Sequence, residues 1–269
     1  MPVLFVAALP LPVGGCFTEL LEGPYVLATG LGPAATLSHT ADGTLLVGGE
    51  TGLWSVDGQG HAVHLLTEAV DSVSASPSRI FVLQGSTLRQ APWPPAPVLA
   101  LSAGIEASGA LQVQAWCQDQ VMITRAGGLS LMDPGDGTQQ PFGPPLAGAR
   151  GGILGPDPDC ASAVVLTDDT LLRVRATTVE PLLEGAIAPR TAAVDEQGRI
   201  WLVNGEPPVL SLVADGTAVT VARYLGQPRA LNFGSGGLLH PQDAYIACAD
   251  GSLDYVRVPA PGEGQAQPR

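Results

Sequence analysis

The sequence of 269 residues predicts an all-β fold, and three observations support this prediction. Short apolar or β-branched runs, each preceded by turn residues, recur along the chain at the spacing typical of strands. No segment keeps the apolar period of an amphipathic helix over three helical turns. The 34 glycines and 25 prolines supply frequent turns, yet together they stay below the ~25–30% typical of low-complexity disorder.

The apolar runs form six similar units. The first run of each unit is Leu45–Val47, Ile80–Val82, Val121–Ile123, Ala163–Val165, Ile200–Leu202 or Tyr245–Ala247. The second run of each unit opens at Leu53, Leu88, Leu129, Leu171, Leu210 or Leu253, at intervals of 35 to 43 residues. A third run follows, as in His64–Leu66, Val98–Ala100 and Val219–Val221, and a strand of small residues such as Arg190–Val194 opens the unit. Six units of four antiparallel strands predict a six-bladed β-propeller, which protects its sheet edges by radial repetition.

The last predicted blade lacks one strand, and the N-terminal segment before the first blade has one strand too many. The predicted blades span about 34–68, 69–105, 109–147, 149–187, 189–227 and 228–259. The last blade has only three strands of its own before the tail 260–269, which we expect to be disordered. The segment 24–32 resembles the outer strands of other units, such as 221–228. We therefore predict that 24–32 completes the last blade and closes the ring of a domain spanning 17–259.

The first sixteen residues are uncharged, apolar and too short to span a bilayer, which is typical of an export signal. The run Val13-Gly14-Gly15-Cys16 resembles a bacterial lipobox, in which the cysteine becomes lipidated. The segment lacks basic residues and contains Pro10 and Pro12, so a buried N-terminal strand is the alternative. We expect an exported lipoprotein of the bacterial envelope, anchored by lipid on Cys16, at the outer membrane or cell surface. Phe17 after the cysteine favours outer-membrane sorting.

Three cysteines remain once Cys16 is lipidated: Cys117, Cys160 and Cys248. None belongs to a CxxC pair or to a Cys/His spacing typical of metal sites. Cys117 and Cys160 both lie just before the second strand of neighbouring units, the runs at Val121–Ile123 and Ala163–Val165, so a disulfide between them is one alternative. Two buried free thiols are the other.

The charge pattern excludes several classes of function. The chain has 12 basic and 25 acidic residues, a formal charge of −13, and every basic residue is arginine. Schiff-base lysines and the Walker A lysine are therefore absent. No segment clusters arginines, and counterion release from nucleic acid needs clustered cations, so we expect no DNA or RNA partner. We also expect a monomer.

Searches for catalytic and metal motifs find no GxSxG elbow, HExxH or EF-hand loop, so we assign no catalytic residue and no metal ligand. Asp133–Gly137 and Asp157–Asp159 faintly resemble calcium loops, but both fall where a hairpin turn is required. The histidines have no carboxylate or serine partner that the sequence reveals, and we expect them on the surface; they are His39, His61, His64 and His240.

Three segments near the C-terminus belong to the last two predicted blades: Pro189–Val203, Pro228–Gly234 and Ala244–Ala249. Together they resemble the last two blades of the gluconolactonase, regucalcin and senescence-marker-protein family, over about seventy residues. Propellers with NHL repeats share much of this pattern. The resemblance implies a six-bladed propeller, in agreement with the repeat count, whereas activity cannot be transferred from a fold alone.

The resemblance also implies a lactonase that depends on a divalent metal, held in the central channel by a Glu, an Asn and an Asp that open inner strands. This sequence departs from that pattern. Arg190, in Pro189-Arg190-Thr191, matches the family's aspartate, and Arg150, in Ala149-Arg150-Gly151, matches its asparagine. Because a guanidinium has no lone pair to offer a metal, these departures speak against metal-dependent lactone hydrolysis.

The same comparison predicts a different site. Arg150, Arg190 and Arg229 occupy equivalent positions at the start of the inner strands of blades four, five and six, where residues line the mouth of a propeller's channel. Three converging guanidinium groups would bind a carboxylate, phosphate or sulfate. The alternative is that each arginine pairs with a carboxylate of a neighbouring blade or is simply solvated.

The sequence thus favours an exported, lipid-anchored and non-catalytic propeller that works as a binding or scaffolding module. Its partner is expected to be a small anionic ligand at the central channel or another envelope protein, and no cofactor is expected. The alternative is a divergent lactonase-like hydrolase on the same fold, which would need a divalent metal.

Overall fold

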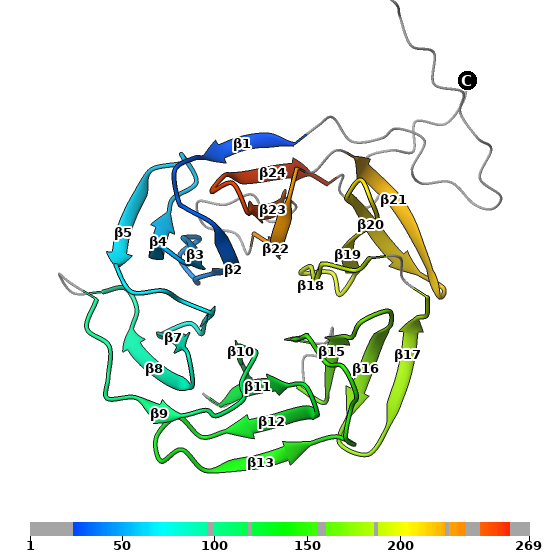
Figure 1. The fold of residues 1–269 in the computed structure, drawn as a ribbon, viewed down its shortest axis with the longest axis horizontal. Helices are drawn as coiled ribbons and strands as arrows, with labels where there is room; N and C mark the ends of the chain where they lie inside the picture. Colours follow the sequence, from blue (N-terminus) through cyan, green and yellow to red (C-terminus); the bar gives the residue numbers. More distant parts are fainter. Residues whose placement is uncertain are drawn as a thin grey trace, which may run out of the picture.

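The computed structural model describes residues 24–95, 99–117, 120–154, 160–185, 188–223, 226–234 and 243–258. These residues form 24 β-strands in six four-stranded antiparallel sheets. The sheets stand in a ring, which confirms the predicted six-bladed β-propeller (Figure 1). In the described part of the chain, no helix is long and apolar enough to cross a membrane.

The blades follow the chain in order, each with its inner strand first. Blade 1 contains β2 (Ala34–His39), β3 (Leu45–Gly49), β4 (Gly52–Val56) and β5 (Ala62–Leu66). Blade 2 contains β6 (Ser72–Ala75), β7 (Arg79–Gln84), β8 (Thr87–Pro92) and β9 (Ile105–Glu106). Blade 3 contains β10 (Gln112–Ala115), β11 (Val121–Arg125), β12 (Gly128–Met132) and β13 (Gln139–Phe142).

Blade 4 contains β14 (Gly151–Leu154), β15 (Ser162–Leu166), β16 (Leu171–Arg175) and β17 (Val179–Leu183). Blade 5 contains β18 (Thr191–Val194), β19 (Ile200–Asn204), β20 (Val209–Ala214) and β21 (Thr217–Arg223). Blade 6 contains β22 (Pro228–Phe233), β23 (Asp243–Cys248), β24 (Leu253–Arg257) and, as its outer strand, β1 (Tyr25–Ala28).

Burial explains why the second strand of each blade is an uninterrupted apolar run. The second strand of a blade lies between two neighbouring blades, so both of its faces are covered, and β3, β15 and β23 are buried at every residue. The outer strand covers the rim instead, and the first three residues of β5 are exposed. Strands buried on both faces have continuous apolar runs instead of alternating patterns.

The N-terminal strand β1 pairs with β24 in antiparallel register, with Tyr25 opposite Tyr255. The two tyrosine rings stack with their centroids 5.3 Å apart. Beyond the strand, the Leu31 amide donates to the Gly251 carbonyl at 3.1 Å. The segment that precedes blade 1 thus supplies the fourth strand of blade 6. This strand is shorter than the predicted 24–32.

The outer strand of blade 2 differs from the expectation. We predicted a strand at Val98–Ala100, but Leu99 and Ala100 are not in a strand and the outer strand is Ile105–Glu106. The segment before it contains four prolines between residues 92 and 97, and proline cannot donate to a ladder. Leu99 instead packs from a loop into the core between blades 1 and 2, with 8% of its surface exposed.

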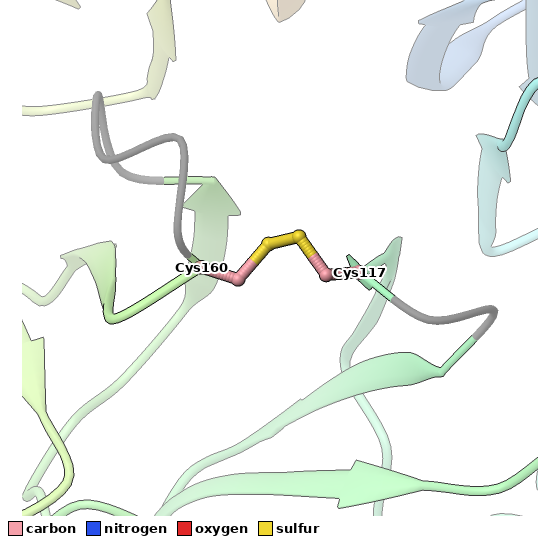
Figure 2. Close-up of a disulfide and its surroundings, with 2 residues drawn as sticks. All are labelled: Cys117 and Cys160. Atoms are coloured by element: carbon pink, nitrogen blue, oxygen red, sulfur yellow. A yellow bond between two sulfur atoms is a disulfide. The ribbon is translucent and has the colours of Figure 1, made fainter.

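A disulfide joins Cys117 to Cys160, 43 residues apart in sequence (Figure 2). Cys117 follows β10 and Cys160 precedes β15, so the bond links blades 3 and 4. The Cα atoms lie 6.1 Å apart, within the range that a disulfide spans. Of the two alternatives that the sequence left open, the bond is the one present, and Cys248 is a buried free thiol. Cys16 and the predicted turn Asp157–Asp159 lie outside the described residues.

Hydroxyl groups connect the inner strands of blades 1, 2 and 3. Thr36 Oγ1 on β2 accepts from the Val73 amide on β6 at 3.2 Å. Ser72 Oγ on β6 accepts from the Val113 amide on β10 at 3.1 Å and donates to the Val113 carbonyl. These bonds satisfy buried backbone groups that no neighbouring strand of the same sheet can reach, because the inner strand is the edge of its sheet.

Candidate functional site

The inner strands of all six blades surround one central cavity of about 540 Å³. A volume of this size suits a small-molecule ligand. Residues at the beginning of the inner strands line one end of the cavity. Residues near their ends, such as His39 and Glu196, line it further along.

The register of backbone hydrogen bonds shows which residues are equivalent from blade to blade. The amides of Arg150 and Arg190, each one residue before its inner strand, donate to carbonyls on the second strand at 2.8 and 2.9 Å. Asp71 and Leu111 precede β6 and β10 in the same way and donate at 2.9 and 2.8 Å. In blades 1 and 6 the corresponding residues, Ala35 and Arg229, lie at bulges in the inner strands, between residues that pair with the second strand. Six residues therefore form a ring, which we call the mouth ring: Ala35, Asp71, Leu111, Arg150, Arg190 and Arg229, all of which line the cavity.

The three arginines of the mouth ring come from consecutive blades, so they lie on one side of it. Arg150 forms an ion pair with Asp168, in which its Nε lies 2.5 Å from Oδ1. Arg190 Nη2 lies 3.5 Å from Glu206 Oε1. Among the described residues, Arg229 has no ion-pair partner, and it is exposed.

These ion pairs differ from the alternative that the sequence allowed, because both carboxylates belong to the same blade as their arginine. Asp168 lies in the turn between β15 and β16, and Glu206 lies in the turn between β19 and β20. The two carboxylate side chains are 67% and 78% exposed. Such solvated pairs contribute about 0–1 kcal/mol, so the guanidinium groups remain available to a ligand.

The other side of the mouth ring consists of Ala35, Asp71 and Leu111, from blades 1, 2 and 3. Asp71 is exposed, and its Oδ2 accepts from the Gly85 amide at 2.6 Å. Leu111 is 47% exposed, an unusual position for a large apolar side chain beside a cavity. Sequence reasoning did not find Asp71 or Leu111. Aligning the residue that precedes the inner strand in all six units is the signal that finds them.

His61 and His64 are exposed, as expected, whereas His39 is not, and His240 lies outside the described residues. His39 is half-buried in the channel, and its Nδ1 lies 2.6 Å from Oδ1 of Asn232 on β22. Asn232 also donates to the Leu37 carbonyl at 3.4 Å, so this pair connects blades 6 and 1. His61 has the carboxylate partner that the sequence did not reveal, because its Nδ1 lies 2.9 Å from Asp57 Oδ2 within one turn.

A channel metal of the kind implied by the family resemblance does not fit these residues. Within the described residues, no group of three or more His, Cys, Asp or Glu side chains could hold a metal ion. Three of the six mouth-ring residues are arginines, which repel a divalent cation and offer it no lone pair. Asp195 also lines the cavity, but its carboxylate is bound by Arg199 at 2.5 Å and by the Trp201 indole at 2.9 Å.

The Asp133–Gly137 segment is the hairpin turn that the sequence predicted. It connects β12 and β13, and the Gly137 amide donates to the Asp133 carbonyl at 2.9 Å. The Asp133 carboxylate accepts from the Gly135 amide at 2.7 Å. Aspartate and glycine are used here for turn formation.

No protein-family model matches this sequence, and no curated protein is significantly similar to it. Several solved structures share the fold. A gluconolactonase from Xanthomonas campestris has a TM-score of 0.68 at 14% identity, with 93% of this chain and 99% of that one covered. A calcium-binding protein from Agrobacterium tumefaciens, regucalcin, has a TM-score of 0.62 at 14% identity, with 88% and 93% covered. A luciferin-regenerating enzyme has a TM-score of 0.62 at 14% identity, with 88% and 96% covered. At such identities the similarity shows the fold alone.

Proposed function

We propose that this chain is a non-catalytic binding module that takes a small anionic ligand at the mouth ring. The observation that supports the proposal best is the grouping of Arg150, Arg190 and Arg229 on one side of a cavity of about 540 Å³. The chain has only 12 basic residues and a formal charge of −13, so three adjacent cations are a marked local exception. Each guanidinium presents several donors in a fork that matches carboxylate, phosphate or sulfate.

We further propose that the module is exported and anchored by lipid on Cys16. The lipobox-like sequence supports this, and so does the disulfide between Cys117 and Cys160, because such bonds persist in oxidising compartments. In that setting the ligand would be an anion outside the cytosol, and a second envelope protein would be the partner of a scaffolding role.

A second candidate is a divergent lactonase-like hydrolase. The similarity to the Xanthomonas campestris gluconolactonase favours it, at 14% identity. This enzyme would need a divalent metal, and the mouth ring offers one carboxylate beside three cations. The binding module therefore predicts that anions bind and divalent metals do not, whereas the hydrolase predicts that a divalent metal binds.

A thermal-shift experiment separates the two candidates, since a ligand of the native state raises the melting temperature by mass action. The full chain with Cys16→Ser, which cannot be lipidated, is titrated with sulfate, succinate and divalent metals. We expect sulfate and succinate to raise the melting temperature, and Arg229→Ala to weaken sulfate binding about tenfold, the value of one charge-assisted hydrogen bond. Because Arg229 has no ion-pair partner among the described residues, this change should leave the unliganded melting temperature nearly constant.

The matched control is Arg223→Ala, an exposed arginine of blade 5 outside the cavity, which should leave sulfate binding unchanged. Stabilisation by metals without any response to anions would contradict the binding module and favour the hydrolase. An equal loss of sulfate affinity in both arginine variants would show that sulfate binding depends on the net charge of the protein instead of on the mouth ring.

A further inference from the structure

We infer that the ligand of the mouth ring is dipolar, with an anionic group for the arginines, a cationic group for Asp71 and an aliphatic chain between them. This inference rests on the proposed anion site and names the class of its ligand. The inference is drawn from the side of the mouth ring opposite the arginines, which consists of Ala35, Asp71 and Leu111.

Asp71 lies across the ring from the arginines. It belongs to blade 2 and Arg190 belongs to blade 5, three blades further along a ring of six. The sheet that contains β7 and β8 indeed stands opposite the sheet of β18 to β21 (Figure 1). Because both residues occupy the same register position of their blades, their charges face the same end of the cavity.

The Asp71 carboxylate is available to a cation. It is exposed, its Oδ2 accepts one backbone hydrogen bond from Gly85, and no described arginine or histidine forms an ion pair with it. A ligand that is only anionic would leave the Asp71 charge on the opposite wall without a cationic partner. A ligand with a cationic end would bind it and gain a second, independent ion pair.

The residues on either side of Asp71 are apolar. Ala35 precedes it and Leu111 follows it in ring order, and Leu111 is 47% exposed. These side chains suit methylene groups more than the hydroxyl groups of a sugar. An α-amino acid carries both of its charged groups on one carbon, so they lie too close together to contact opposite walls of a cavity of about 540 Å³. The two charges must therefore be separated by several carbons.

Calorimetric titration of the full chain with Cys16→Ser tests this class of ligand with three probes: sulfate, hexanoate and 6-aminohexanoate. We expect 6-aminohexanoate to bind at least about threefold more tightly than hexanoate, as one solvated ion pair allows. Asp71→Asn should abolish this advantage while sulfate affinity stays the same or rises. Asp215→Asn, on an exposed turn of blade 5, is the matched control and should keep the advantage.

The outcomes also separate this inference from the proposed function. If hexanoate binds as tightly as 6-aminohexanoate, or if the advantage persists in Asp71→Asn, the ligand is not dipolar, although sulfate binding that depends on Arg229 would leave the anion site standing. If none of the three probes binds, both proposals are wrong. Unchanged circular dichroism and melting temperature of Asp71→Asn would show that its effect does not come from misfolding.

Discussion

The carboxyl group of Asp254 on β24 is the least satisfied acidic group in the described part of the last blade. Asp254 is 9% exposed, and its Oδ1 has no hydrogen-bond partner. Its Oδ2 lies 3.8 Å from the Cys248 thiol. Burial raises the pKa of Asp254 above 3.8, and burial together with the Asp254 charge raises the pKa of Cys248 to about 11.

A raised carboxyl pKa has a defined effect on stability. The folded protein holds the proton of Asp254 more tightly than the unfolded chain, so the favourable contribution is greatest below pH 3.8 and is lost as the pH rises through the raised pKa. At pH 7 the buried charge costs free energy. We therefore expect Asp254→Asn to increase the free energy of unfolding at pH 7 by about 1 kcal/mol.

Urea denaturation between pH 4 and pH 8 measures this effect. The stability gain of Asp254→Asn should shrink toward the acidic end of the range. Asp250→Asn is a control of opposite sign in the same hairpin, because hydrogen bonds from Ser252 lower the pKa of Asp250. A gain that does not depend on pH would contradict the assignment to the Asp254 charge.

At the scale of the elements, the inner strands depend on side chains from the neighbouring blade. Ser72 and Ser74 on β6 accept from the amides of Val113 and Ala115 on β10, at 3.1 and 2.8 Å. All four residues are buried or nearly so. A hydroxyl at these positions is therefore part of the sheet-to-sheet contact that forms the wall of the channel.

Replacing Ser72 by alanine should leave the buried amide and carbonyl of Val113 without partners. We expect the free energy of unfolding to fall by about 1–3 kcal/mol, the cost of unsatisfied buried polar groups. Chemical denaturation measures the loss. Ser108→Ala, an exposed serine beside β10, is the control, and an equal loss in both variants would show that Ser72 Oγ has no special role.

Many of the elements follow from local sequence patterns. The runs at Val121–Ile123 and Ala163–Val165 lie in the buried strands β11 and β15, because a strand covered on both faces favours a continuous apolar run. The run Val98–Ala100 has a similar apolar composition, but its described residues, Leu99 and Ala100, are not in a strand. The prolines before Leu99 cannot donate hydrogen bonds to a β-ladder, which disfavours a strand there. The Leu99 side chain is buried from a loop instead.

At the scale of the whole molecule, β1 pairs with β24, and we expect the stability of the ring to depend on this pairing. Deleting 24–32 would expose the edge of β24 from Leu253 to Tyr255, together with the Tyr255 ring, against which Tyr25 stacks. Exposed strand edges pair with other chains, so we expect the shortened protein to aggregate or to melt at a much lower temperature. Soluble yield and melting temperature check this expectation.

The control for this deletion removes 260–269, which the sequence predicts to be disordered. That shortened chain should keep the melting temperature of the parent. A 24–32 deletion that remains soluble, monomeric and equally stable would contradict the role of β1 in closing the ring.

The candidate site shows how far sequence reasoning reached. Arg150, Arg190 and Arg229 were found because each begins an inner strand in the repeat. Their ion pairs with Asp168 and Glu206 were not found, since partners 16 to 18 residues away meet only when the hairpin between them is folded. Asp71 and Leu111 occupy the same register position, but they share neither charge nor shape with the arginines, so no motif drew attention to them.

The sequence by itself determined the number of units, the order of strands and the apolar second strand of every blade. These features are local, because the alternation of turns and apolar runs within about forty residues dictates one four-stranded sheet. Only the tertiary structure decided that Cys117 bonds to Cys160, that Asp254 is buried without a full set of partners, and that Asp71 lies across the cavity from Arg190. Each of these features depends on which blades become neighbours and which face each other when the ring closes. The sequence of a single repeat does not specify that arrangement.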